Sequence, residues 1–223
     1  MSQRVYVERN LVFGGIADDS PNTFGNFNPK KIQAFYDFME LVLDGTNKYT
    51  MYLDTTSTIA VGANGAVLTT TTADTTTATI AAGGVFWYPA KNPVVEFLFK
   101  IDVITNVSIF AGFTDTGSEA SSYLPARIIT ASMTATADNE AGFLFDTRQS
   151  ASYFNVCNAN ATTGAFTQLA STYVPVAATN LTLRVALDST GAARYYWNGL
   201  QVKTKALAVS TTTPLVPYFG IRN

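Results

Sequence analysis

The sequence of 223 residues contains no histidine, a single cysteine and few charged residues. Histidine is the commonest general base and the commonest metal ligand, so its absence excludes a Ser-His-Asp triad and a histidine-ligated metal centre. Cys157 has no second cysteine for a disulfide or a CxxC site, and no histidine to activate it as a nucleophile. We therefore expect Cys157 to be a small buried side chain.

Charged residues make up 13 % of the chain and the net charge is −2, whereas an average soluble domain has about 25 % charged residues. Apolar residues still reach 47 %, which excludes an intrinsically disordered chain. No basic run suits nucleic acid, and no apolar run approaches the roughly 20 residues of a membrane helix. Arg4, Glu8 and Arg9 interrupt any signal-peptide core. We expect neither nucleic acid nor a membrane as a partner.

Residues 1–29 predict an extended N-terminal arm. Two short β-prone pieces are followed by Gly14-Gly15 and by further turn-forming residues. The apolar side chains of these pieces have no local partner, so we expect them to be buried against the main domain, a neighbouring subunit or another protein. The predicted interface residues are Val5, Tyr6, Val7, Leu11, Val12 and Phe13.

One amphipathic helix is predicted over residues 30–45. Asn28 can serve as its N-cap, Pro29 suits the first helical position, and Gly45 follows as a stop signal. Helical spacing places several apolar residues on one stripe, namely Ile32, Phe35, Met39, Val42 and Leu43. This stripe is typical of a docking face.

After the helix the hydrophobic period changes to two. Apolar and polar residues alternate over 49–54, 95–102 and 181–188, and each stretch predicts a strand with one buried face. Further strands are predicted at 80–88, 107–115, 126–133, 142–147, 153–158, 166–171 and 215–222. This pattern predicts an all-β fold, an antiparallel β-sandwich or jelly roll, over residues 46–223.

Two Asn-Gly pairs predict β-hairpins with type I′ turns, because both central residues of such a turn need positive φ. They are Asn64-Gly65 and Asn198-Gly199, and the second belongs to a predicted three-strand meander that starts with the strand at 181–188. The threonine-rich run 69–79 predicts a Thr-faced hairpin that turns near Asp74.

Carboxylate chemistry is the catalytic class that the composition leaves open. A glycoside hydrolase needs two carboxylates that face one cleft, and Glu96 with Glu140 is the pair that the sequence offers. Glu96 and Asp102 share a strand face, but Lys100 lies between them, which favours a solvated face with an ion pair. We therefore predict no catalytic residues and no enzyme activity.

Asp138-Asn139-Glu140 is the densest polar cluster, and together with Asp146 it offers oxygen ligands of the kind that Ca²⁺ prefers. EF-hand spacing is absent, however, and Asp138-Asn139 also suits a turn between two strands. We predict no metal site and no cofactor.

Two tryptophans are candidates for stacking on a sugar, which gives a second hypothesis of a carbohydrate platform at Trp87 and Trp197. Neighbouring residues on a strand point to opposite faces, so Tyr195 and Trp197 share one face and Tyr196 points to the other. One of these two faces is expected to be core.

From about Tyr49 to the C-terminus the chain resembles the concanavalin A-like sandwiches (lectin, glucanase and laminin-G-like) of tailed-phage virion proteins. The likeness is one of hydrophobic strands and turns. It is carried by Gly65–Thr69, Val94–Ile101, Ser108–Asp115, Asn139–Asp146, Leu181–Asp188, Gly191, Arg194–Gly199 and Leu215–Asn223.

This resemblance implies a virion component, often a decoration or cement protein on the capsid surface, made in the host cytoplasm and commonly trimeric. Its implied partners are the major capsid protein or other virion proteins. The catalytic motif of the glucanase branch and the metal-site pattern of the lectin branch are not matched. We therefore expect a non-enzymatic protein that stabilises a capsid lattice by non-covalent contacts. The alternative is a carbohydrate- or receptor-binding module of a virion, on a tail or head fibre.

Overall fold

The computed structural model describes residues 49–54, 56–62, 65–71, 76–82, 87–116, 124–129, 132–148, 153–161 and 163–223. The predicted arm with its interface residues (Val5, Tyr6, Val7, Leu11, Val12 and Phe13) and the predicted helix over 30–45 lie outside these residues. Among the residues that are described, no helix is long and apolar enough to cross a membrane.

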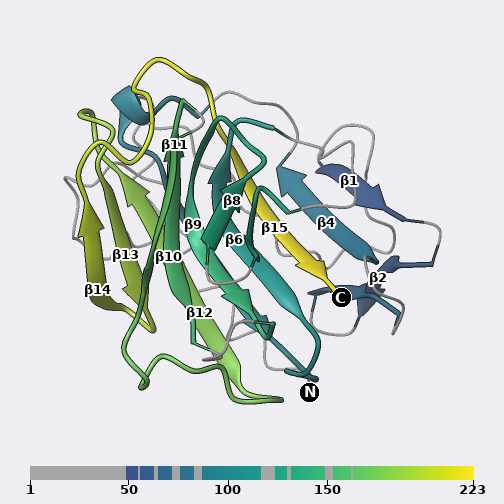
Figure 1. Cartoon of the computed structure of the whole chain (residues 1–223). Helices are drawn as coiled ribbons and strands as arrows, with labels where there is room; N and C mark the ends of the chain where they lie inside the picture. The colour runs from purple at the N-terminus through teal and green to yellow at the C-terminus, as the bar shows by residue number, and fades with distance from the viewer. Residues whose placement is uncertain are drawn as a thin grey trace, which may run out of the picture.

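The described strands pack as two antiparallel sheets (Figure 1). The larger sheet has seven strands in the spatial order β1 (Tyr49–Leu53), β4 (Thr77–Ala82), β15 (Val216–Arg222), β6 (Ser108–Thr114), β9 (Asn139–Asp146), β10 (Asn155–Asn160) and β11 (Thr163–Gln168). The smaller sheet has four, in the order β14 (Leu200–Lys205), β13 (Ala193–Trp197), β12 (Asn180–Leu187) and β5 (Val94–Lys100). The prediction of an all-β antiparallel sandwich is confirmed.

Two hairpins and one short helical turn complete the described structure. The hairpins are β2 (Thr58–Gly62) with β3 (Gly65–Thr69), and β7 (Ala126–Ile129) with β8 (Ser132–Ala135). A single turn of 3-10 helix, η2 (Pro89–Lys91), leads into β5. Pro89 suits this place because its ring presets the φ angle of a first helical residue.

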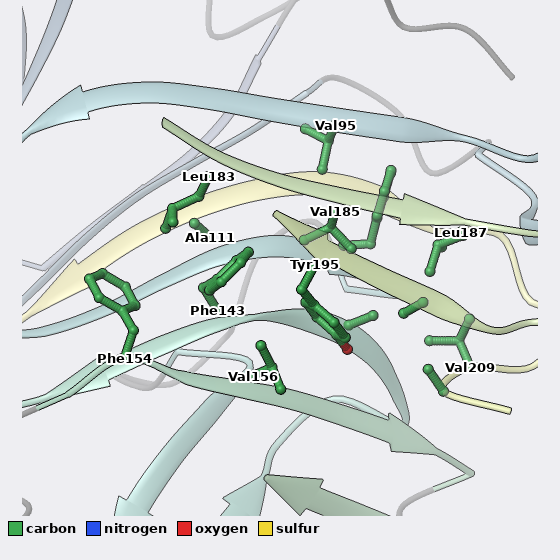
Figure 2. Close-up of a cluster of buried hydrophobic side chains, with 14 of the residues drawn as sticks. Val95, Ala111, Phe143, Phe154, Val156, Leu183, Val185, Leu187, Tyr195 and Val209 are labelled. Atoms are coloured by element: carbon green, nitrogen blue, oxygen red, sulfur yellow. The ribbon is translucent and has the colours of Figure 1, made fainter. Parts of the chain in front are cut away.

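The main core lies between the inner faces of the two sheets, the faces that point toward each other. Figure 2 shows Phe143 of the larger sheet beside Tyr195 and Leu183 of the smaller one. The rings of Phe143 and Tyr195 meet edge to face, with centroids 5.6 Å apart and planes at 89°. The Tyr195 hydroxyl donates to the Cys157 carbonyl oxygen at 3.0 Å, so the one polar atom of this fully buried ring has a partner in the opposite sheet.

A second apolar layer covers the outer face of the larger sheet, the face directed away from the smaller sheet. Leu124, Ala126 and Ile128 of the β7–β8 hairpin region pack there with Phe110 and Tyr218. In Figure 1, β8 crosses in front of β9 and β6. The burial of β6, β9 and much of β10 on both faces follows from this cover.

The β2–β3 hairpin packs beside the β1 edge of the larger sheet. Ile59 and Leu68 of this hairpin pack against Tyr49 and Ile80. The pairing of β2 with β3 confirms the predicted hairpin, but Gly65 pairs with Gly62 inside the ladder and is therefore not a central turn residue as the Asn64-Gly65 pair predicted. The second Asn-Gly prediction is confirmed, since Asn198 and Gly199 have φ angles of 48° and 83° between β13 and β14.

Two strand predictions were wrong. The stretch 126–133 is two strands rather than one, because Ile128 and Met133 pair across the β7–β8 hairpin and both pack on the same apolar layer. The threonine run is not a hairpin either, since β3 pairs with β2 whereas β4 pairs with β1 and β15. The small side chains of β4 are buried on both faces, which is a property of an interior strand.

The turn between β12 and β13 is built around the Asp188 carboxylate. Its Oδ1 accepts hydrogen bonds from the Thr190 hydroxyl at 2.6 Å and from the backbone N–H groups of Thr190 and Ala192 at 2.9 and 3.1 Å. Arg194 lies 3.6 Å from Oδ2. Burial raises the pKa of Asp188, but the hydrogen bonds and the Arg194 charge outweigh it, so the net pKa lies below the ordinary aspartate value.

We expect Phe143→Ala to lower the free energy of unfolding by about 3–5 kcal/mol, because it removes a fully buried ring from between the sheets. Leu98→Ala is the matched control, since the Leu98 side chain is 59 % exposed and its truncation should change stability by less than about 0.5 kcal/mol. Urea denaturation measures both values. Equal values for the two variants would contradict the placement of Phe143.

Asp188→Asn should lower stability at neutral pH by under about 1 kcal/mol, because the carboxylate is partly exposed. A carboxyl whose pKa is lowered by folding stabilises the protein above its unfolded pKa and loses that contribution as the pH falls through the folded pKa. The difference between wild type and variant should therefore vanish between about pH 5 and pH 2. Thermal unfolding at several pH values measures it, and a difference independent of pH would contradict the prediction.

Candidate functional site

A pocket of about 190 Å³ opens at the end of the sandwich where β5 and β13 finish and β12 begins. The antiparallel pairing of these strands brings Ile101, Asn180 and Trp197 to the same end of the smaller sheet. The loop between β11 and β12 supplies the rest of the wall. The lining residues are Ile101, Thr172, Val174, Pro175, Val176, Thr179, Asn180, Leu181, Trp197 and Asn198.

The Trp197 indole is held in one orientation by two other rings. Phe154 lies 5.2 Å away between centroids and Tyr173 lies 5.6 Å away, each at an interplanar angle of 69°. Trp197 also pairs with Leu183 in β12 and with Leu200 in β14. The indole is therefore fixed by the core before any ligand arrives.

Backbone hydrogen bonds fix the loop that forms the opposite part of the lining. The Phe154 N–H donates to the Tyr173 carbonyl at 3.2 Å, and the Leu169 N–H donates to the Phe154 carbonyl at 3.0 Å. Farther along, the Ala178 N–H donates to the Ile101 carbonyl at 2.7 Å. These bonds connect both halves of the loop to the sandwich, so the pocket is preformed.

The polar groups of the pocket are neutral amides and hydroxyls. The Asn198 Oδ1 accepts from the Thr182 N–H at 2.9 Å, which leaves its Nδ2 as the available donor. Within the described part of the chain, the side chains of Thr172 and Asn180 make no hydrogen bond and line the pocket. These groups can donate to and accept from a bound hydroxyl group.

No charged side chain lines the pocket as far as the described residues show. The nearest charges along β5 are Lys100 and Asp102 on either side of Ile101, and they pair with each other at 3.0 Å. Both side chains are well exposed, so this ion pair lies outside the pocket and solvent screens its two charges. The pocket therefore offers an ionic ligand no partner of opposite charge.

The two tryptophans that the sequence suggested for sugar stacking lie in different parts of the fold. Trp87 is 8 % exposed, belongs to the main core and exchanges backbone hydrogen bonds with Leu215 at 2.9 and 3.0 Å. Its ring therefore offers no surface for stacking, because it fills space between the sheets. Trp197 is partly buried and lines the pocket.

The paired aromatic residues of β13 lie as the strand period predicts. Tyr195 is fully buried on the inner face, whereas Tyr196 lies on the outer face of the smaller sheet with the Arg184 guanidinium 4.2 Å from its ring centroid. A cation over a tyrosine face is stabilised by the ring quadrupole. This face of Tyr196 is therefore already occupied.

The two carboxylates considered for hydrolysis lie on different sheets and do not face one cleft. Glu96 is on the outer face of the smaller sheet, in register with Arg184, and burial raises its pKa while the Arg184 charge lowers it. Glu140 is fully buried in β9, between Asn139 and the core residue Ala141. The geometry of an acid–base pair about 5–9.5 Å apart across a substrate is therefore not met by these two residues.

The residues of the polar cluster considered for Ca²⁺ make contacts with separate partners. The Asp146 carboxylate takes two hydrogen bonds from the Arg148 guanidinium at 2.9 and 2.7 Å. Asn139 accepts from the Ser210 N–H at 3.0 Å and donates to Asp115. Over the described residues there is no group of three or more acidic, Cys or His side chains that could hold a metal ion.

Several residues of the pocket were not identified as site residues from the sequence. Thr172, Tyr173 and Asn180 lie in or beside the loop between two predicted strands, and no motif marks them. They are brought together by contacts between distant segments. The one local sequence feature that could have indicated this part of the pocket is the apolar loop around Pro175, whose residues show no strand period.

Comparisons with known proteins identify the fold. No model of a known protein family matches the chain, and no curated protein matches it at the level required for significance. Among solved structures, it is similar to the potassium-bound carbohydrate recognition domain of Emp46p, with a TM-score of 0.56 and 9 % identity over 84 % of this chain and 87 % of that one.

Two further structures show the same likeness. The Bacillus licheniformis β-glucanase has a TM-score of 0.52 and 12 % identity over 85 % of this chain and 84 % of the enzyme. The Emp47p carbohydrate recognition domain has a TM-score of 0.52 and 11 % identity over 84 % of this chain and 85 % of that domain. The fold is thus a concanavalin A-like β-sandwich, found in both lectin-like domains and an enzyme.

The different burial of the two tryptophans gives a fluorescence prediction. In Trp87→Phe the remaining Trp197 should be quenched by acrylamide, whereas in Trp197→Phe the remaining Trp87 should be quenched far less, because it is enclosed between the sheets. The slopes of the two quenching plots measure the difference. Equal slopes in two folded variants would contradict these positions.

Proposed function

We propose that this chain is a non-catalytic carbohydrate-binding β-sandwich whose binding site is the Trp197 pocket. The observation that carries the proposal is the combination of a fixed, partly exposed indole with neutral amide and hydroxyl groups in one preformed pocket. It corresponds to the carbohydrate-binding alternative that the sequence left open, with Trp197 retained and Trp87 omitted.

The chemistry of a sugar suits this pocket. A pyranose ring has an apolar C–H face that can lie on an aromatic ring, and a rim of hydroxyl groups that donate and accept hydrogen bonds. Trp197 offers the aromatic surface, while Asn180 and Thr172 offer polar groups that have no other partner in the described chain. Because the site is preformed, binding costs little ordering of the protein.

The fold is consistent with this role. Two of the similar structures are named as carbohydrate recognition domains, and these names describe those proteins. At about 10 % identity they carry no binding residue over to this chain, so the proposal depends on the pocket itself.

Hydrolysis is not part of the proposal, although one similar structure is a β-glucanase. Glu96 and Glu140 belong to different sheets, and the outer face of the larger sheet is covered by the β7–β8 layer. Neither carboxylate lines the Trp197 pocket. A sugar bound there would meet no acid–base pair among the described residues.

The resemblance to phage virion proteins suggests where such a module would act. A capsid or fibre partner, a trimeric assembly and a place on the virion surface are proposals that rest on the sequence resemblance alone. The number of copies of this chain in a purified particle would test them. A particle that lacks the chain would contradict the virion assignment, and this result would not bear on the proposed carbohydrate site.

The binding proposal is tested on a glycan array with the full chain and two variants. We expect Trp197→Ala to weaken binding of any glycan that the wild type retains by at least about tenfold, which corresponds to about 1.4 kcal/mol for one central aromatic contact. Tyr88→Ala is the matched control, because Tyr88 is 44 % exposed and does not line the pocket. Circular dichroism verifies that each variant is folded.

Two results would contradict the proposal. One is the absence of any bound glycan with folded wild-type protein. The other is equal loss of binding in Trp197→Ala and Tyr88→Ala, because only the first change alters the pocket.

A further inference from the structure

We infer that the Trp197 pocket selects a single, uncharged sugar unit at the end of a glycan chain, with Asn180 as the residue that reads its hydroxyl groups. This inference rests on the proposed carbohydrate-binding function and specifies its ligand class. Three properties of the pocket lead to it, namely its size, its lack of charge and the uncommitted amide of Asn180.

The size of the pocket limits the ligand to one ring. A volume of about 190 Å³ lies below the 300–1,000 Å³ of typical drug-sized sites. This is the scale of one pyranose or furanose unit. The remainder of a longer glycan must lie outside, so the bound unit has its linkage on the open side, as a terminal residue does.

The described lining favours a neutral unit over a charged one, because it offers no charged partner. Among the described lining residues, Ile101, Val174 and Leu181 are apolar and none is ionisable. A carboxylate, sulfate or ammonium group placed there meets no side chain of opposite charge in the described lining. Lys100 does not line the pocket, and its ammonium lies 3.0 Å from the Asp102 carboxylate on the exposed rim.

Asn180 is the group best suited to distinguish one neutral sugar from another. Its backbone is fixed at the first position of β12 by pairing with Lys100, while its side-chain amide has no partner within the described structure. An amide offers both an acceptor oxygen and two donor hydrogens, so it can contact two neighbouring hydroxyl groups at once. The Asn198 amide is partly committed, because its Oδ1 already accepts from the Thr182 N–H.

The test uses array glycans in matched pairs that differ only at the terminal residue. One pair member ends in glucose or galactose, the other in glucuronate or galacturonate, and a third form has the neutral terminal residue extended by a second neutral hexose. We expect retention of the neutral-ended glycans, at least tenfold weaker retention of the acidic-ended ones, and loss of binding on extension. Asn180→Ala should weaken binding of the neutral-ended glycan at least tenfold and leave the thermal midpoint unchanged, because its side chain is exposed.

The outcomes separate this inference from the proposed function. Binding that is lost in Trp197→Ala but is equally strong for acidic-ended or extended glycans would overturn the inference and keep the function. Neutral-end selectivity that survives in Asn180→Ala would overturn the role of Asn180. No bound glycan at all, or binding that Trp197→Ala leaves unchanged, would overturn both the function and the inference.

Discussion

A continuous series of aromatic contacts connects the middle of the core to the wall of the pocket, and the binding site depends on it. Tyr195 meets Phe143 edge to face between the sheets, Phe143 meets Phe154, and Phe154 meets Trp197 at 5.2 Å. Tyr173 then contacts the same indole from the loop. The packing that holds the two sheets together thus also fixes the orientation of the group proposed to bind the ligand. This preorganisation lowers the cost of ordering the protein in the ligand binding that we propose for the pocket.

The low content of charged residues in the sequence is matched at the pocket, whose described lining holds none. Charged residues are 13 % of the chain, and those near the pocket pair with one another at its rim. Elsewhere the ionised side chains satisfy turns or neighbours, as Asp188 does at the β12–β13 turn and as Asp146 does with Arg148. The described lining of the pocket, which holds no charged side chain, suits a neutral ligand better than an ionic one.

The sequence predicted the sandwich well because strand burial follows a period of two, as in β12, where Leu181, Leu183 and Leu187 face the core. It failed where tertiary contacts override local patterns. The small threonines of β4 suit an interior strand as well as a hairpin, and Ile128 pairs with Met133 only because a second layer covers the larger sheet. The local sequence does not show that Trp87 is buried and Trp197 partly exposed, because the burial of each side chain depends on residues that are distant in the sequence. Asn180 and Tyr173 meet Trp197 through pairing and loop contacts that no local motif encodes.

The central claim is that a sugar contacts the Trp197 indole. Tryptophan emission during titration of Trp87→Phe with the best array glycan tests this claim directly, because Trp197 is then the only indole. We expect a saturable change in emission whose midpoint equals the dissociation constant from calorimetry. Saturable binding by calorimetry without any change in emission would place the sugar elsewhere on the molecule and contradict the account.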